Sequence, residues 1–382
     1  MYTIYMKNCS IEISAPALRH NIKVISKKLP KKSKLLCVIK ANAYGHGFDE
    51  VSTILKDVPL VDWFGVFDFN DAIRLRQKTK KPILVLANTP ESFWDTACKE
   101  KISITLSAGD QLKQLTKYEN NKKLKWHLKV DTGLGRQGLL SSDMLKTVAL
   151  LDRHSLKPEG LYSHFSGVEE KQFDKYSFNQ YTMLIAWKNA LSAINLHPLL
   201  HISGTAGVLR HDLFGLDMVR IGLGTYGLWP SQEVKKTVSD NKFLKPVLSF
   251  KTHISEMKTL PGGAKVAYDC THTLTQEAKV AILPVGYWDG LPRTLSSKGI
   301  VLVRGKRAPI IGRIMMNMCV IDTTHIPAVK QGDTVTIIGK DKTEEVTTDE
   351  FASLAGTINY EVVTRLNPTI ERKITGLQKK AK

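Results

Sequence analysis

Short runs of apolar residues alternate with longer amphipathic stretches between residues 35 and about 225. Such runs are typical of strands that are buried on both faces of a sheet. The runs that predict strands are residues 35–39, 63–67, 83–86, 102–106, 126–130, 160–163, 199–202 and 218–221. Helical periodicity separates them. In the first expected helix Leu18, Ile22, Ile25 and Leu29 share one face, and Pro30 follows as a stop.

Eight strands with intervening helices favour a (β/α)8 barrel over an open, doubly wound sheet, although one misassigned strand would reverse that choice. From about residue 243 the pattern of apolar and polar residues changes. Expected strands at 247–256, 278–285, 300–303, 319–322 and 334–338 are joined by turn residues rather than helices. One helix is expected to begin near Thr348 and to end at Gly356. We therefore predict an α/β fold, with an N-terminal (β/α)8 TIM barrel over residues 1–242 and a mostly antiparallel β domain over residues 243–382.

Composition narrows the classes of function. The 382 residues suffice for two domains, and 55 Lys and Arg against 36 Asp and Glu give a formal charge of +19. This charge attracts anions, but no helix-turn-helix, zinc-finger or RRM signature accompanies it, so we expect a solvated surface and no nucleic-acid partner. No apolar run approaches the roughly 18 residues of a membrane span, so no membrane association is expected.

The cysteines and the start of the chain point to the cytoplasm. Five scattered cysteines form no C-x-x-C pair, which argues against a disulfide framework and against a structural zinc site, so no metal is expected. The first ten residues lack the apolar core of a secretory signal.

Candidate chemistry gathers at the C-terminal ends of the expected barrel strands, where such barrels carry their active sites. Lys40 ends the first strand. Burial there would lower its pKa and favour Schiff-base chemistry with an aldehyde; the alternative is a lysine that reaches out to solvent. Residues 129–136 form a glycine-bearing turn that carries Arg136, and the sixth strand ends at His164. The loops at 201–205 and 220–224 occupy the usual phosphate position, where backbone N–H groups and a hydroxyl hold an anion.

Residues 38–47, Val-Ile-Lys-Ala-Asn-Ala-Tyr-Gly-His-Gly, closely resemble the pyridoxal-phosphate lysine motif of the alanine racemases. The resemblance continues over almost the whole chain, through residues 129–136, 162–165, 217–227, 286–293, 305–316 and 358–361. It implies a pyridoxal 5'-phosphate enzyme that interconverts L-alanine and D-alanine and supplies D-alanine for peptidoglycan.

The resemblance also implies roles for individual residues. Lys40 would carry the cofactor, His164 would lie against its ring, and Arg220 would bond to the ring nitrogen. Residues expected to hold the phosphate are Tyr44, Thr205, Gly222, Leu223 and Tyr360. Arg136 and Met316 would contact the substrate, and Lys129 could be carbamylated to orient Arg136.

Inverting a stereocentre is simplest with one base on each face, and the resemblance assigns Lys40 and Tyr268 to these roles. A free tyrosine has a pKa of about 10, so it needs a positive environment, which we expect from His164 and Arg220. Arg220 should not give its proton to the ring nitrogen, which weakens the electron sink and should suppress transamination. Without the lysine motif, Tyr268 would be taken for a cross-strand aromatic. The family implies a head-to-tail homodimer in which Tyr268 and Met316 of one chain face Lys40 of the other.

Some positions depart from the family pattern and leave substrate range open. They are Gly204, Asp269, Trp288 and Asn317. The nearest alternative is a broader-specificity racemase for serine or basic amino acids, against which Tyr360 favours a tight pocket for a methyl group. A decarboxylase of the same barrel class would place an acid at the ring nitrogen, where this chain has Arg220. A non-catalytic cofactor-binding protein generally lacks the second domain.

Overall fold

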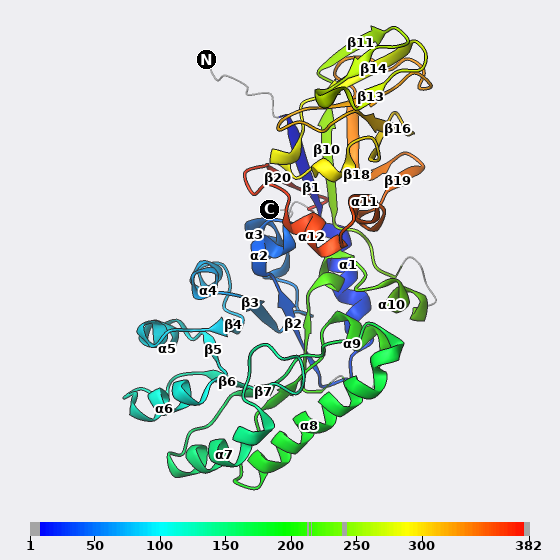
Figure 1. Cartoon of the computed structure of the whole chain (residues 1–382). Helices are drawn as coiled ribbons and strands as arrows, with labels where there is room; N and C mark the ends of the chain where they lie inside the picture. Colours follow the sequence, from blue (N-terminus) through cyan, green and yellow to red (C-terminus); the bar gives the residue numbers. More distant parts are fainter. Residues whose placement is uncertain (1–7, 212–213, 215, 239–242, 378–382) are drawn as a thin grey trace, which may run out of the picture. The chain divides into compact units, whose positions relative to one another are not determined.

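The computed structural model describes residues 8–211, 214, 216–238 and 243–377 (Figure 1). Contacts divide the chain into two compact units. The barrel unit comprises Leu18–Ala41 and Val51–Lys245, and the β unit comprises Met1–Ala17, Asn42–Glu50 and Pro246–Lys382. The expected boundary between residues 242 and 243 borders a segment, 239–242, that lies outside the described residues. That boundary stays a prediction.

The barrel unit is built on one sheet of eight parallel strands in the order β8-β7-β6-β5-β4-β3-β2-β9. The strands are β2 (Lys34–Val38), β3 (Trp63–Val66), β4 (Ile83–Asn88), β5 (Ser103–Leu106), β6 (Trp126–Lys129), β7 (Gly160–Tyr162), β8 (Leu199–His201) and β9 (Met218–Ile221). Backbone hydrogen bonds also join the segments at the two ends of this order, from Asp217 N to Leu200 O at 3.0 Å and from Arg220 N to Ser203 O at 2.9 Å. The eight strands expected from the apolar runs are confirmed.

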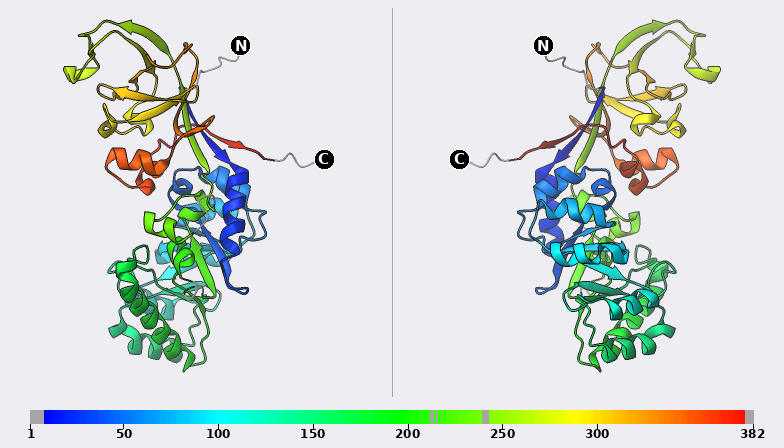
Figure 2. Two further views of the ribbon diagram at one scale, coloured as in Figure 1. Left: turned by 90° about the vertical axis from the view of Figure 1, so that its right-hand side faces the viewer. Right: turned by 90° about the vertical axis from the view of Figure 1, so that its left-hand side faces the viewer.

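Helices lie around the outside of this sheet (Figure 1), and Figure 2 gives two side views of them. They include α4 (Phe69–Arg76), α5 (Trp94–Glu100), α6 (Gly109–Lys117), α7 (Met144–Arg153) and α8 (Asp174–Ser192). In α8 the residues Ser177, Gln180, Leu184, Trp187 and Leu191 are buried, and their spacing of three or four places them on one face.

The first helix is shorter than its sequence pattern predicts. α1 spans Ala15–Ser26, and Leu18, Ile22 and Ile25 are fully buried. Leu29 lies beyond the end of the helix, so its expected place on the helical face is wrong. Turn residues 27 and 28 end the helix before Pro30 is reached.

The β unit contains a ten-stranded, mostly antiparallel sheet in the order β11-β14-β17-β16-β15-β18-β10-β1-β20, with β19 paired to β18. Its strands are β1 (Cys9–Ser14), β10 (Leu248–His253), β11 (Glu256–Leu260), β14 (Ala278–Leu283), β15 (Ile300–Val303), β16 (Lys306–Ile311), β17 (Cys319–Asp322), β18 (Thr334–Asp341), β19 (Glu344–Val346) and β20 (Arg372–Thr375). The expected antiparallel texture is confirmed. β1 was not predicted; it pairs antiparallel with β10 and parallel with β20.

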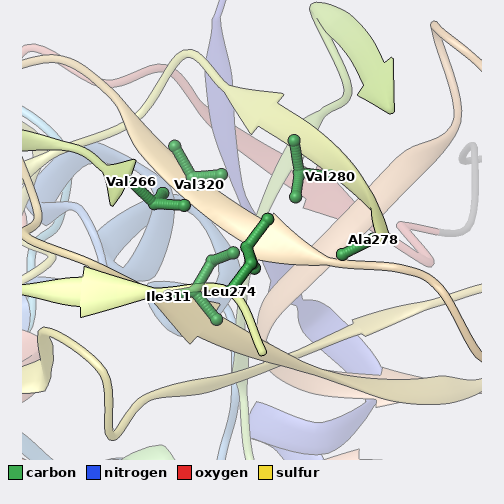
Figure 3. Packing of buried hydrophobic residues seen from close by; sticks show 6 residues of the cluster. All are labelled: Val266, Leu274, Ala278, Val280, Ile311 and Val320. Atoms are coloured by element: carbon green, nitrogen blue, oxygen red, sulfur yellow. The ribbon is translucent and has the colours of Figure 1, made fainter. Parts of the chain in front are cut away.

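A small hairpin, β12 (Lys265–Val266) and β13 (His272–Thr273), shares a hydrophobic cluster with β14, β16 and β17 of the large sheet (Figure 3). The buried members are Val266, Leu274, Ala278, Val280, Ile311 and Val320. The cluster anchors the segment that leads to Tyr268, because Val266 is two residues away and is almost fully buried.

Two helices complete the β unit. α11 (Thr348–Ala355) begins at Thr347, whose side chain accepts a hydrogen bond from Glu350 N, and it ends at Gly356 with φ +75°. This confirms the expected helix. α12 (Asn359–Thr364), which the sequence analysis did not predict, carries Tyr360.

Candidate active site

Lys40 lies directly beyond the buried strand β2, at the start of the short turn α2 (Lys40–Tyr44). Burial lowers the pKa of Lys40, and the nearby cations Arg136 and Arg220 lower it further. A lower pKa increases the fraction of neutral amine, which is the form that attacks an aldehyde or accepts a proton.

The backbone after Lys40 is left-handed for four residues without a glycine. Ala41, Asn42, Ala43 and Tyr44 have φ values of +53°, +53°, +54° and +52°. Each such residue costs about 1–2 kcal/mol. Asn42 braces the turn, since its carbonyl accepts from Gly47 N at 2.9 Å and its side-chain oxygen accepts from Phe48 N at 2.8 Å.

The next residues of this segment are tied to the end of the chain within the β unit. Arg372 Nε donates to the Gly45 carbonyl at 3.0 Å. A Cβ atom at Gly45 would lie 1.7 Å from the Val363 carbonyl oxygen, so the segment passes directly over α12. Residues 42–50, which carry Tyr44, thus pack on the helix that carries Tyr360. Burial raises the pKa of Tyr44 to about 12.

Arg220, in β9, is a buried cation of the barrel unit. Its Nη1 contacts His201 Nδ1 at 2.7 Å, and its Nη2 contacts the Ser163 carbonyl at 2.7 Å, the Ile202 carbonyl at 2.8 Å and His164 Nδ1 at 3.0 Å. Burial lowers the pKa of Arg220 to about 10, so the side chain remains protonated at neutral pH. In the described part of the chain these bonds use Nη1 and Nη2, and none of them uses the Nε–H group.

His164 does not carry the positive charge that the sequence analysis assigned to it. Burial, followed by the charges of Arg220 and Arg136, lowers the pKa of His164 well below its ordinary value. The imidazole is therefore neutral at neutral pH, and it accepts at Nδ1 because a guanidinium can only donate. Of His164 and Arg220, only Arg220 is therefore positively charged.

Two short turns form the expected phosphate position. α9 (Thr205–Arg210) follows Gly204, and the 3-10 turn η5 (Leu223–Tyr226) follows Gly222. Thr205 Oγ1 accepts from Gly224 N at 3.2 Å, so the two turns lie together. The first N–H groups of such turns lack partners within the turn and point toward an anion.

The loop that carries Arg136 is held by Asp131. The two carboxylate oxygens of Asp131 accept from four backbone N–H groups, those of residues 133–136, at 2.7–3.1 Å. Lys129 donates to Gln137 Oε1 at 3.1 Å. Burial, with the charges of Arg220 and Arg136, lowers the pKa of Lys129 to about 7, so a large share of its amine is neutral near pH 7.

Tyr162 was missed as a site residue. Its ring stacks on His201 with a centroid distance of 4.7 Å, and it faces both Lys129 Nζ at 5.3 Å and the Arg220 guanidinium at 5.1 Å. An aromatic face attracts cations, so the ring separates and holds two like charges. The sequence feature that could have indicated Tyr162 is its position near the end of an expected strand.

Tyr268 and Met316 lie in the β unit, where they line one pocket. Its other lining residues are Tyr287, Arg293, Ile314, Met315, Asn317 and Met318. Tyr268 is 67% exposed and Met316 is 56% exposed. Tyr287 N donates to the Met315 carbonyl at 3.0 Å, which joins the two segments of the pocket.

The structure thus brings the expected residues together in two groups. The barrel unit gathers Lys40, Lys129, Arg136, His164, Thr205, Arg220, Gly222 and Leu223 at the C-terminal ends of its strands and in the loops that follow them. The β unit carries Tyr44, Tyr268, Met316 and Tyr360. Among the described residues no group of three or more His, Cys, Asp or Glu is suited to a metal ion, and no helix there is long and apolar enough to cross a membrane.

Comparisons with known proteins agree with this geometry. Residues 13–230 match the family described as alanine racemase, N-terminal domain, and residues 247–374 match alanine racemase, C-terminal domain. An alanine racemase of Desulforamulus reducens is 35% identical over 374 residues, covering 96% of this chain and 98% of that protein. One from Leptospira interrogans is 36% identical over 370 residues, covering 95% and 94%.

Solved structures show the same fold. A crystal structure of alanine racemase from D-cycloserine-producing Streptomyces lavendulae superposes with a TM-score of 0.89 at 28% identity and covers 97% of this chain and 98% of that one. The alanine racemase of Bacillus anthracis with bound L-Ala-P also gives 0.89, at 29% identity, and covers 99% and 97%.

Proposed function

Since this chain belongs to the alanine racemase family, whose members are pyridoxal-phosphate-dependent isomerases, we propose that it interconverts L-alanine and D-alanine with two bases, Lys40 and Tyr268. The observation that carries the proposal is the desolvated Lys40 beside the buried Arg220 at the C-terminal ends of the barrel strands. D-alanine for peptidoglycan is the expected use of the product.

Eight residues would hold pyridoxal phosphate, which supplies an electron sink for the substrate when bound. They are Lys40, Tyr44, His164, Thr205, Arg220, Gly222, Leu223 and Tyr360. The donor set fits such a group: a lysine with a lowered pKa suits a carbonyl, the Nε–H group of Arg220 suits a ring nitrogen, and the turns at Thr205 and Leu223 suit a phosphate.

The two bases exchange a proton with opposite faces of the substrate. Lys40 acts as a neutral amine on one face, for which its lowered pKa prepares it. Tyr268 acts on the other face through its phenolic oxygen. Arg220 keeps its own proton at neutral pH and so leaves the ring nitrogen without one, which limits electron withdrawal and favours return of the proton over transamination.

Arg136 and Met316 would contact the substrate, with Arg136 pairing to its carboxylate. Lys129 supports this role as a carbamate: its neutral amine adds carbon dioxide, releases one proton and leaves an anion for Arg136. The pKa of about 7 supports this chemistry, because only an unprotonated amine reacts. A carbamate signal in ¹³C spectra recorded under labelled carbon dioxide should be absent from Lys129→Ala.

We further propose that residues 1–242 carry the cofactor and residues 243–382 the second base, in a head-to-tail homodimer. Tyr268 and Met316 of one protomer would face Lys40 of the other. Exposure of these two side chains and of Trp288, which is 62% exposed, supports a covered surface in the working enzyme. The five cysteines are all unpaired, which supports a cytoplasmic location.

The roles of the bases are tested by substitution. Lys40→Ala should lower racemisation at least about a thousandfold and Tyr268→Phe about a hundredfold or more, since acid–base groups contribute roughly 10²–10⁴-fold. Lys34→Ala, an exposed lysine at the start of the same strand, is the control and should match the wild type. An unchanged rate in Lys40→Ala would overturn the proposal, and L-serine, L-lysine and L-arginine as substrates would measure its breadth.

Mixing the two inactive variants tests the shared site. A heterodimer of Lys40→Ala and Tyr268→Phe would hold one intact site, so random exchange of subunits should restore about a quarter of wild-type activity. A mixture that stays inactive after verified exchange would place both bases within one chain.

A further inference from the structure

A line of buried polar side chains leads away from Arg220 through the inside of the parallel sheet. His201 in β8 and His127 in β6 are both fully buried. Arg220 Nη1 lies 2.7 Å from His201 Nδ1, His201 Nε2 lies 2.9 Å from His127 Nδ1, and His127 Nε2 lies 3.6 Å from Glu159 Oε2. Glu159 directly precedes β7, at the other end of the strands from Lys40.

The direction of every bond in this line follows from its ends. A guanidinium only donates, so His201 must accept at Nδ1 and carry its proton on Nε2. That proton leaves His127 to accept at Nδ1, which puts the proton of His127 on Nε2, toward the carboxylate of Glu159. Burial lowers the pKa of both histidines and the charge of Arg220 adds to this; at His127 burial outweighs the Glu159 carboxylate, which raises the pKa, so both rings are neutral.

The surrounding residues are shaped for this arrangement. A Cβ atom at Gly160 would lie 2.2 Å from His127 Nδ1, so glycine makes room for the ring although its own backbone is ordinary. Tyr162 stacks on His201 with the two planes 5° apart.

Glu159 is held as an anion by its neighbours. Ser103 Oγ donates to Oε2, and Lys125 Nζ lies 3.3 Å from Oε1. Burial opposes the charge, but the facing His127 ring, the hydrogen bond from Ser103 and the charge of Lys125 outweigh it and lower the pKa of Glu159 to about 2.

We propose that Glu159 is a positioning residue for Arg220, acting through His127 and His201. Its carboxylate stabilises the Nε2–H tautomer of His127, the one that His201 requires, and so reinforces the acceptor that His201 presents to Nη1 of Arg220. Without an acceptor at position 159, His127 is free to move its proton to Nδ1, where it opposes the proton of His201. The two N–H groups then face each other, which weakens the hydrogen bond from Arg220 to His201. In our proposed function, on which this inference rests, this guanidinium binds the ring nitrogen of the cofactor.

Two variants separate the acceptor from the charge. Glu159→Leu removes both, whereas Glu159→Gln keeps an oxygen that accepts from His127 and loses the charge. Glu159→Asp, which withdraws the carboxylate by one methylene, is a milder second test, because this smaller change should leave the protein folded. Glu119→Gln, an exposed acid that lies just before β6, is the matched control.

The first measurement needs no cofactor. Two-bond ¹H–¹⁵N spectra of the histidine rings in the full chain should show the Nε2–H tautomer for both His127 and His201. Glu159→Leu should lose the Nε2–H pattern at His127, Glu159→Asp should weaken it, and Glu159→Gln and the control should retain it.

The second measurement uses the holoenzyme. Glu159→Leu should weaken cofactor binding about tenfold and raise the share of turnovers that end in transamination, with Glu159→Gln within about twofold of the wild type. Unchanged tautomers in Glu159→Leu, equal damage from Leu and Gln, or altered tautomers with unchanged binding and partition would each overturn the proposal. A wild-type chain that binds no pyridoxal phosphate would instead defeat the proposed function and leave the tautomer result standing.

Discussion

Both proposed bases stand beside left-handed backbone, but the two segments are braced in different ways. The first follows Lys40 and spans residues 41–44, all with φ between +52° and +54°. The second surrounds Tyr268, where Ala267, Asp269 and Cys270 have φ values of +60°, +63° and +49°. Each left-handed residue costs about 1–2 kcal/mol, so both segments need support from elsewhere.

The first segment continues into residues supported from inside the β unit. Arg372 donates to the Gly45 carbonyl and, with Nη1 and Nη2, to the carbonyls of residues 366, 367, 368 and 370, and only 9% of its surface is exposed. Beyond the buried Val266, the second segment is supported at the surface, where Asp269 pairs with Arg293 at 3.5 Å and Arg313 at 3.4 Å. Buried hydrogen bonds resist salt, whereas exposed ion pairs are screened, so the base at Tyr268 stands on the softer support.

The largest expected effect is at Gly45. Gly45→Ala should lower the free energy of unfolding by about 4 kcal/mol or more, because the new Cβ would overlap the Val363 carbonyl. Gly356→Ala is the matched control: its φ of +75° is close to the +77° of Gly45, but nothing lies within 4 Å. It should cost only about 1 kcal/mol in urea unfolding. Equal losses would mean that the first segment is not held by its packing on α12.

A smaller effect is expected from the titration of His46, which is fully buried two residues after the first segment. Burial lowers the pKa of His46 to about 4, from an ordinary value near 6.5. The unfolded chain then binds the extra proton, so this group costs nothing above about pH 7 and about 3 kcal/mol of stability is lost as the pH falls from about 6.5 to about 4. His46→Gln should flatten the stability profile in that window relative to the wild type, whereas His154→Gln, at an exposed position, should leave it unchanged.

The smallest effect is expected in the second segment. Asp269→Gly removes two exposed ion pairs worth less than about 1 kcal/mol each and relieves a left-handed residue worth about 1 kcal/mol, so unfolding should change by less than about 1 kcal/mol. Its stability should also respond less to added salt than that of the wild type. A loss above about 2 kcal/mol would show that surface pairs brace the second segment as firmly as buried bonds brace the first.

The sequence pattern predicts a helix or strand only where the buried residues of that element form a visible apolar run in its own sequence. The barrel strands carry runs of consecutive buried residues, as in residues 83–85 of β4, so these runs stand out in the sequence. β1 offers only Ile11 and Ile13 as buried positions, and its partners β10 and β20 come more than 230 residues later. The residues next to β1 in the sequence therefore do not indicate its pairing with β10 and β20.

The site divides in the same way. Lys40, Arg136 and Arg220 could be predicted because strand ends and glycine-bearing turns are visible in the sequence. The left-handed turn could not, because Ala41 and Ala43 are alanines, the strongest right-handed helix formers. The roles of His127 and Glu159 were also hidden, since they depend on which side chains of neighbouring strands meet inside the sheet.

The late arrival of β20 has a consequence for synthesis. A ribosome adds about 5–20 residues per second, so β1 waits roughly 10–50 seconds for β10, and longer for β20. During that time Ile11 and Ile13 have no sheet to enter, and Gly45 has no Arg372 to bind. A nascent chain that stops before residue 372 would therefore leave both the first strand and the segment after Lys40 unfinished, however complete its barrel strands are.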